Sequence, residues 1–206
     1  MQKSSTYFII GTSTEVGKTI AAAIITQALE ADYWKPIQSG DLHYTDTDKV
    51  QKLISNPHTT FHPNAYALNT PASPHLSAAL DGIEIALEKI VRPTTSRPLV
   101  IEAAGGLLVP LNDRDTIADL IHPIDRIVLV SRHYLGSINH TLLTYEALQS
   151  RGLPLYGIIF SGTPAPDTER LILAKTGAKH IGTIAEEPYF DPAVIRDYAE
   201  QFLPNL

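Results

Sequence analysis

The sequence predicts an α/β fold in which a doubly wound, mostly parallel sheet is flanked by helices. Short apolar segments of strand type alternate with longer segments of helical apolar spacing along most of the chain. Residues 99–101 are apolar without alternation, which is typical of a parallel strand buried on both faces. Because 44% of the 206 residues are apolar and no linker or repeat interrupts them, we expect one domain over residues 1–206.

A glycine-containing segment, GTSTEVGKT at residues 11–19, lies between the first expected strand (residues 7–10) and the first expected helix (residues 20–29). Gly17 allows the backbone to approach a phosphate, and the first amides of the helix have no intrahelical partner. The Lys18 ammonium can then reach the outer phosphates of a nucleotide, and the Thr19 hydroxyl can bind Mg²⁺. The segment therefore predicts nucleotide binding. The alternative is an ordinary strand-to-helix turn with an exposed lysine.

Charge and composition exclude several classes of protein. The chain has 22 acidic and 16 basic residues and no basic run, so a nucleic-acid partner is not expected. It has no cysteine, which excludes disulfides, thiolate metal ligands and cysteine nucleophiles. No signal peptide or membrane-spanning stretch is recognisable, and we expect a cytoplasmic protein with a small substrate and no membrane partner.

The second expected strand, residues 33–34, leads into the segment KPIQSG at residues 35–40. Lys35 and Ser39 would then lie at the carboxyl end of a strand, where open α/β sheets bind their ligands. The alternative for this segment is a solvated turn rich in proline and glycine.

Two aspartates precede the next helix, which is expected over residues 49–54. Asp48 is a candidate to complete a Mg²⁺ site with Thr19, since magnesium takes one or two protein carboxylates. Thr47 or Asp46 is expected to cap the helix.

A strand at residues 66–68 is followed by two expected helices, at residues 73–80 and 83–91. The second is predicted to be amphipathic and to end at Pro93. The histidines show no metal-ligand spacing, so we interpret them as polar structural residues.

The segment LVIEAAGG, residues 99–106, is the second centre of expected chemistry. Its apolar strand delivers Glu102 to the sheet edge as a second candidate ligand for the metal. Gly105 and Gly106 would let backbone amides approach a phosphate or a substrate oxygen. A simply solvated glutamate before a glycine turn is the alternative.

The remaining chain continues the alternation of strands and helices. The expected elements are strands at residues 127–130, 155–160 and 180–184 and helices at residues 137–149, 167–176 and 192–202. Ser137 is expected to cap the first of these helices. The free amides at the start of that helix would suit a second anion, such as a substrate carboxylate, and capping alone is the alternative.

These groups favour phosphoryl transfer. Lys18, Lys35 and Mg²⁺ can supply the charge neutralisation and alignment that this chemistry requires. A second lysine facing the γ-phosphate is most useful when the acceptor is also anionic, so we expect a carboxyl-like acceptor.

Five motifs, in order and spacing, resemble those of dethiobiotin synthetases: GTSTEVGKT, KPIQSG, the aspartate of TDTDKV, IEAAGGLLVP and LGSINHTLLT. The resemblance implies a fold of the P-loop NTPase type and a homodimer with active sites at the subunit interface. It also implies a reaction in which ATP activates a carbamate made from CO2 and 7,8-diaminononanoate. The neighbouring amine then closes a cyclic urea, and ADP and phosphate are released.

The resemblance further implies roles for residues at matching positions. Nucleotide contacts are expected from Glu15, Val16, Gly17, Lys18, Thr19, Glu102 and Gly105. Mg²⁺ would be held by Thr19, Asp48 and Glu102. Thr14, Lys18 and Lys35 are the expected catalytic groups. Substrate contacts are expected from Thr14, Lys35, Ser39, Gly105, Ser137, Ile138 and Asn139, the last three acting from across the dimer interface.

The chain departs from the family pattern where the purine base is read. Ser161-Gly162 replaces the usual Asn-Asp pair, and Ala185 stands where a proline is expected. These departures predict weak discrimination among nucleoside triphosphates. A nucleotide-switched partition or positioning ATPase is the rival function, but Ser13 occupies roughly the place of the extra lysine that such proteins carry.

Overall fold

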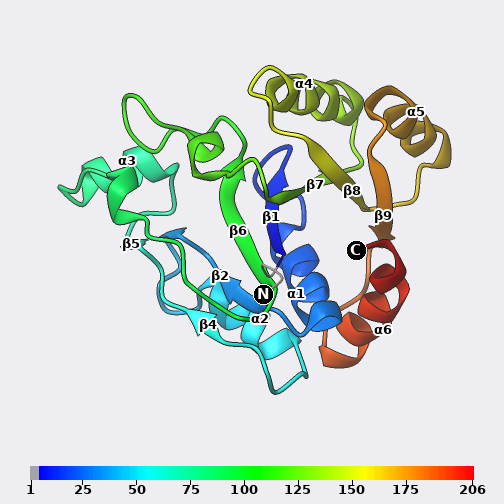
Figure 1. Ribbon diagram of the computed structural model, residues 1–206, viewed down its shortest axis with the longest axis horizontal. Helices are drawn as coiled ribbons and strands as arrows, with labels where there is room; N and C mark the ends of the chain where they lie inside the picture. Colours follow the sequence, from blue (N-terminus) through cyan, green and yellow to red (C-terminus); the bar gives the residue numbers. More distant parts are fainter. Residues whose placement is uncertain (1–4) are drawn as a thin grey trace.

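The computed structural model describes residues 5–206, in which a seven-stranded sheet is covered by helices on both faces (Figure 1). The strand order is β4-β2-β6-β1-β7-β8-β9, and every pairing is parallel. A separate parallel pair joins β3 to β5. The strands are β1 (Thr6–Gly11), β2 (Asp32–Trp34), β3 (Ile37–Ser39), β4 (Phe61–His62), β5 (Tyr66–Leu68), β6 (Leu99–Gly106), β7 (Arg126–Arg132), β8 (Leu155–Ser161) and β9 (Lys179–Ile184). The predicted doubly wound α/β fold is confirmed.

The helices divide between the two faces of this sheet. They are α1 (Lys18–Leu29), α2 (Asp46–Leu53), α3 (Pro74–Leu80), α4 (Ser137–Gln149), α5 (Pro166–Thr176) and α6 (Pro192–Phe202), with short 3₁₀ turns at Leu87–Lys89, Ile117–Leu120 and Leu203–Asn205. Helices α1, α2 and α6 pack on one face, and α4 and α5 pack on the other. Within residues 5–206, no helix has the length and apolar character that crossing a bilayer requires.

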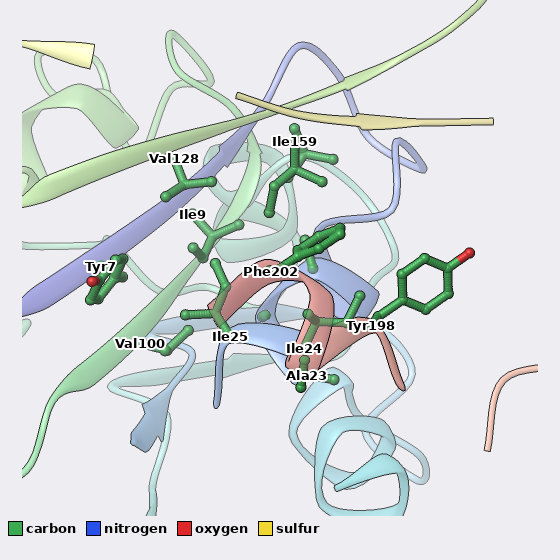
Figure 2. Packing of buried hydrophobic residues seen from close by; sticks show 14 of the residues in the cluster. Tyr7, Ile9, Ala23, Ile24, Ile25, Val100, Val128, Ile159, Tyr198 and Phe202 are labelled. Atoms are coloured by element: carbon green, nitrogen blue, oxygen red, sulfur yellow. The ribbon is translucent and has the colours of Figure 1, made fainter. Parts of the chain in front are cut away.

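The alternation of side chains along β1 sends its residues into two separate cores. Tyr7 and Ile9 face α1 and α6, whereas Phe8 and Ile10 face the opposite side. Figure 2 shows the first core, in which side chains of four neighbouring strands meet Ile24 and Ile25 of α1 and Tyr198 and Phe202 of α6. Because the central strands are covered on both faces, the polar edge of the sheet is the place left for a ligand.

The connections of the two central strands diverge at that edge. The chain leaves β1 through α1 to β2 on one side, and it leaves β6 toward β7 on the other side of β1. Such a reversal opens a crevice at the carboxyl ends of the strands, where open α/β sheets bind ligands.

The helix predicted at residues 83–91 does not form; only the 3₁₀ turn Leu87–Lys89 is helical there. Tertiary hydrogen bonds occupy the backbone groups that a helix would use. The amide of Ala86 donates to the hydroxyl of Tyr66 at 3.0 Å, and Asn112 donates to the carbonyl of Ile85 at 2.8 Å. Ile85 itself is buried in the core, which favours this irregular path over an isolated helix.

Two predicted helix caps are also corrected. Thr45, rather than Thr47 or Asp46, caps α2, because its hydroxyl accepts from the amide of Asp48 while the Asp48 carboxylate accepts from the amide of Thr45. Gly136, rather than Ser137, is the N-cap of α4, with a φ of 105°. Ser137 is the first residue inside that helix and is buried.

Candidate active site

A cavity of about 960 Å³ lies at the carboxyl ends of β1, β2 and β6. The residues that line it come from the phosphate loop, the segment after β2, the start of α2 and the end of β6. Among the residues predicted from the sequence, the walls include Thr14, Glu15, Gly17, Lys18, Thr19, Lys35, Ser39, Glu102 and Gly105. Tertiary structure thus joins the expected nucleotide, metal and acceptor groups around one space.

The phosphate loop turns into α1 at Gly17, the N-cap residue, whose φ of 96° lies in the left-handed region that favours glycine. The loop also contacts the end of β8, where the Ser161 hydroxyl donates to the carbonyl of Val16 at 2.7 Å. Val16 does not line the cavity, because its side chain is buried in the core between α1 and the sheet. The amide end of α1 therefore faces the cavity from a fixed position.

Lys18 folds back over the loop that it follows. Its ammonium donates to the carbonyl of Ser13 at 2.9 Å, and its side chain is buried. Burial lowers the pKa of Lys18 to about 8, against the opposing attraction of Glu102. The ammonium therefore lies within the phosphate loop, at the wall of the cavity.

Glu102 is the centre of the site, and both of its carboxylate oxygens accept hydrogen bonds. Oε1 accepts from the Thr19 hydroxyl at 2.8 Å and from the Lys35 ammonium at 3.1 Å. Oε2 accepts from the Tyr33 hydroxyl at 2.7 Å. Glu102 therefore links Thr19, at the end of the phosphate loop, to the lysine that follows β2.

Lys35 is buried between two carboxylates. Its Nζ lies 2.7 Å from Oδ2 of Asp46 and 3.1 Å from Oε1 of Glu102. Burial alone would lower the pKa of Lys35, but the charges of Glu102 and Asp46 outweigh it and raise that pKa. Burial opposes ionisation of Asp46 as well, yet Lys35 lowers the pKa of this carboxyl to about 2. Lys35 and Asp46 are therefore both charged at neutral pH.

The structure replaces Asp48 by Asp46 among the candidate metal ligands. Asp46 lines the cavity and contacts Lys35, whereas Asp48 is exposed and its carboxylate accepts from both the amide and the hydroxyl of Thr45. The reason is the helix start at Asp46, because the capping box turns the third residue of the helix away from the sheet edge. The two positions cannot be distinguished from the spacing alone.

The acceptor side of the cavity carries a free hydroxyl and a glycine turn. The Oγ of Ser39 is buried and has no hydrogen-bond partner within residues 5–206, although Ser39 lines the cavity. Gly105 adopts a φ of 80°, and a β-carbon there would lie 3.0 Å from the side chain of Val109. Thr14 is exposed at the rim of the same cavity.

The start of α4 is not part of this cavity. Ser137, Ile138 and Asn139 are absent from its lining, and the residues before them include the fully exposed Leu135. Figure 1 shows α4 over β7 and β8, away from the segment that follows β2. These three residues cannot serve the cavity of their own chain in this arrangement.

The oxygen donors at Glu102 fit a magnesium ion. Two carboxylates and a hydroxyl, from Glu102, Asp46 and Thr19, belong to the hard ligands that Mg²⁺ prefers, with phosphates and water completing its shell. Within the part of the chain that the structure describes, no group of three or more His, Cys, Asp or Glu side chains could hold a metal.

Two contacts of the site are not predicted from the sequence: the hydrogen bond from Tyr33 to Glu102 and that from Ser161 to the carbonyl of Val16. A tyrosine inside a short buried strand carries no motif signal, and its contact with Glu102 depends on the alignment of β2 with β6. Asp46 was visible in the sequence and was assigned to capping.

Comparison with known proteins agrees with these features. A family model described as an AAA domain matches residues 5–194. The chain is 58% identical over 200 residues to the ATP-dependent dethiobiotin synthetase BioD of Christiangramia forsetii, covering 97% of each chain. It is 46% identical over 201 residues to the protein of that name from Cytophaga hutchinsonii, again over 97% of each chain, and 43% identical over 198 residues to that from Agrobacterium fabrum, over 95% of this chain and 93% of the relative.

Similar solved structures share the fold at low sequence identity. A ParA family ATPase from Chlorobium tepidum has a TM-score of 0.61 and 11% identity, covering 97% of this chain and 99% of that chain. The septum site-determining protein MinD of Pyrococcus horikoshii, complexed with Mg-ADP, has a TM-score of 0.60 and 13% identity. The match covers 97% of this chain and 86% of that chain. These likenesses establish the architecture of a P-loop ATPase and nothing about the substrate.

Proposed function

This chain belongs to the family of ATP-dependent dethiobiotin synthetases, and we propose that the cavity around Glu102 is where it carries out that reaction. An amine of 7,8-diaminononanoate adds to CO2 and loses a proton to give a carbamate. A carbamate oxygen then attacks the γ-phosphorus of ATP, which forms a carbamic-phosphoric anhydride and releases ADP. Attack of the neighbouring amine on the carbonyl carbon expels phosphate, and the amine loses a proton as the cyclic urea closes.

We assign the nucleotide to the phosphate loop, residues 11–19. The free amides at the start of α1 and the Lys18 ammonium would bind the phosphates, with Lys18 leaving the carbonyl of Ser13 as it does so. Thr19, Glu102 and Asp46 would hold Mg²⁺, which neutralises phosphate charge when it is bound.

Lys35 is assigned to the contact between the carbamate and the γ-phosphate. Its ammonium is charged, buried and held by Asp46 and Glu102 at the place where two anionic reactants would meet. Ser39 has an unpartnered hydroxyl within the described chain that faces the same cavity, and Thr14 and Gly105 border it. These groups would orient the acceptor and stabilise charge that develops as phosphorus is transferred.

The distal carboxylate of the substrate is assigned to a second copy of the chain. The first turn of α4 contains Ser137, whose amide donates to the carbonyl of Tyr134, and then Ile138 and Asn139, whose amides would suit an anion. This turn does not border the cavity of its own subunit. The exposed apolar side chains of Leu135 and Leu143 flank that turn, as expected of a surface that another subunit covers. A homodimer would bring the two parts of the site together.

We assign the enzyme to the cytoplasm, where ATP and bicarbonate are available. The alternative of a partition or positioning ATPase has no support beyond the shared fold, because the ParA and MinD structures are only 11–13% identical to this chain.

The observation that carries the proposal is the meeting of Thr19 and Lys35 on one oxygen of Glu102. It joins the nucleotide end of the cavity to the acceptor end. The test is to incubate the purified protein with 7,8-diaminononanoate, bicarbonate, Mg²⁺ and ATP, and to follow ADP and the cyclic urea by mass spectrometry. We expect ADP release that depends on the diamine, with one urea per ADP. Bound ATP without any urea product would overturn the assignment of this cavity.

A further inference from the structure

We propose that Tyr33 is a positioning residue that fixes which oxygen Glu102 presents to the metal-nucleotide end of the cavity. The inference rests on the proposed function, because it concerns the carboxylate assigned to Mg²⁺. Tyr33 does not line the cavity and touches no expected reactant. It would act only through Glu102.

The alignment of β2 with β6 explains why this phenol reaches Glu102. Tyr33 pairs with Val100, and side chains two residues apart on a strand share a face. Glu102 therefore lies on the same face as Val100, one pleat further toward the carboxyl end. Lys35 follows Tyr33 at the same spacing, so the phenol and the ammonium approach the carboxylate from one side of the sheet.

The ring of Tyr33 cannot easily move. Tyr33 is 0% exposed and belongs to the core beneath α1. The centroid of its ring lies 5.8 Å from that of the Phe61 ring. The packing fixes the position of the phenol oxygen, which lies 2.7 Å from Oε2 of Glu102. The hydroxyl can donate to this carboxylate oxygen without any movement of the ring.

The two carboxylate oxygens of Glu102 accept hydrogen bonds from different groups. Oε2 accepts from Tyr33, while Oε1 accepts from Thr19 and Lys35. Without the phenol hydroxyl, the buried Oε2 of Glu102 would lose its hydrogen-bond donor. The carboxylate could then rotate until both of its oxygens accept from Lys35. A Glu102–Lys35 pair of that kind would compete with a metal ion for the carboxylate. Groups that orient a metal ligand in this way affect metal affinity although they never contact the metal.

A purely structural hydrogen bond would have different consequences. Its loss would lower the free energy of unfolding but leave the response to Mg²⁺ unchanged. Tyr33→Phe separates the two roles, since it removes only the hydroxyl and keeps the ring in the core. Tyr7→Phe is the matched control: Tyr7 is 2% exposed in the same core, and its hydroxyl accepts from Arg126, away from Glu102.

The first readout is ADP binding by calorimetry as a function of Mg²⁺ concentration, which does not depend on turnover. Mg²⁺ should increase the affinity for ADP, and the quantity to compare is the Mg²⁺ concentration that gives half of this increase. For Tyr33→Phe we expect that concentration to rise about tenfold to a hundredfold. This is the size expected for the loss of one hydrogen bond to a charged group. Binding of ADP without metal should be unchanged, and Tyr7→Phe should match the wild type. An unchanged Mg²⁺ response in a folded Tyr33→Phe protein would overturn the proposal.

A second variant covers the case in which Tyr33→Phe does not fold. Incorporation of 3-fluorotyrosine at position 33 keeps the phenol and its shape but changes its hydrogen-bond strength. A shifted Mg²⁺ response at position 33, but not for 3-fluorotyrosine at position 7, would support the proposal, and identical responses would refute it. Failure of the wild type to form the cyclic urea would instead refute the proposed function, because the ADP measurement reports the role of Tyr33 separately.

Discussion

The ammonium of Lys35 lies 2.7 Å from the carboxylate of Asp46, although Lys35 follows β2 and Asp46 begins α2. The ion pair anchors the start of α2 against the segment that follows β2. It also means that the cationic group assigned to the acceptor is already held in a defined direction before any ligand binds.

Replacing Lys35 with Ala should mainly lower turnover. The ammonium is assigned to charge that develops during phosphoryl transfer, so we expect kcat to fall about a hundredfold or more, ~3 kcal/mol, with a smaller change in KM for ATP. Steady-state kinetics would measure both. Lys52→Ala is the control, because Lys52 is an exposed residue of α2 that does not line the cavity. An unaltered kcat would remove Lys35 from the mechanism.

Asp46 and Asp48 should respond differently to substitution by Asn. Asp46 lines the cavity, so Asp46→Asn should raise the Mg²⁺ concentration that gives half-maximal turnover. Asp48→Asn should weaken the start of α2 and lower Tm slightly, with turnover within about twofold of the wild type. Magnesium titrations and thermal unfolding of both variants provide the comparison. The opposite pattern would return the metal to Asp48, as the sequence alone suggested.

Lys18→Gln should abolish measurable nucleotide binding. The ammonium is assigned to the outer phosphates, and its loss should weaken the affinity for ATP a hundredfold or more, ~3 kcal/mol. Calorimetry with a non-hydrolysable ATP analogue would measure the change. Lys175→Gln, at an exposed position on α5, should bind as the wild type does. Unchanged affinity in Lys18→Gln would refute the phosphate role.

Nucleotide affinity should fall as the pH rises above about 8. Burial lowers the pKa of Lys18 to about 8 in the free protein, and phosphate oxygens would raise it again in the complex. Below pH 8 the lysine is already charged and affinity should not depend on it. Above pH 8 binding must take up a proton, so affinity should fall by up to about tenfold per pH unit. Calorimetry in buffers of different ionisation enthalpy would detect the uptake, and Lys18→Arg, which stays charged, should not show it.

The enzyme should discriminate weakly between ATP and other nucleoside triphosphates. β8 ends at Ser161 and Gly162 follows it; the Ser161 hydroxyl donates to the carbonyl of Val16 and is not free to bind a base. Competition assays with ATP and GTP should give kcat/KM values within about tenfold of each other. A strong preference for ATP would show that other groups read the base, with the exposed carboxylate of Glu186 beside Gly162 as the first to examine.

The sequence predicted the main strands and helices because their signals are local. Residues 11–19 carry the spacing of a phosphate loop, and residues 99–106 combine a continuous apolar strand with an acid and a glycine turn. Residues 83–91 carry a helical pattern of the same kind, yet no such helix forms. Backbone groups there bind Tyr66 and Asn112, which are distant in the chain, and no local pattern records those contacts.

The fold class can be predicted from the alternation of strands and helices along the chain, and the phosphate loop and Glu102 from residue order within short segments. That Asp46 and not Asp48 faces the cavity is visible only in three dimensions, because the capping box of Thr45 orients the start of α2. The hydrogen bond from Tyr33 to Glu102 likewise requires the register of β2 against β6. The direction in which a side chain points depends on the packing of several elements at once, and that packing is absent from any single segment.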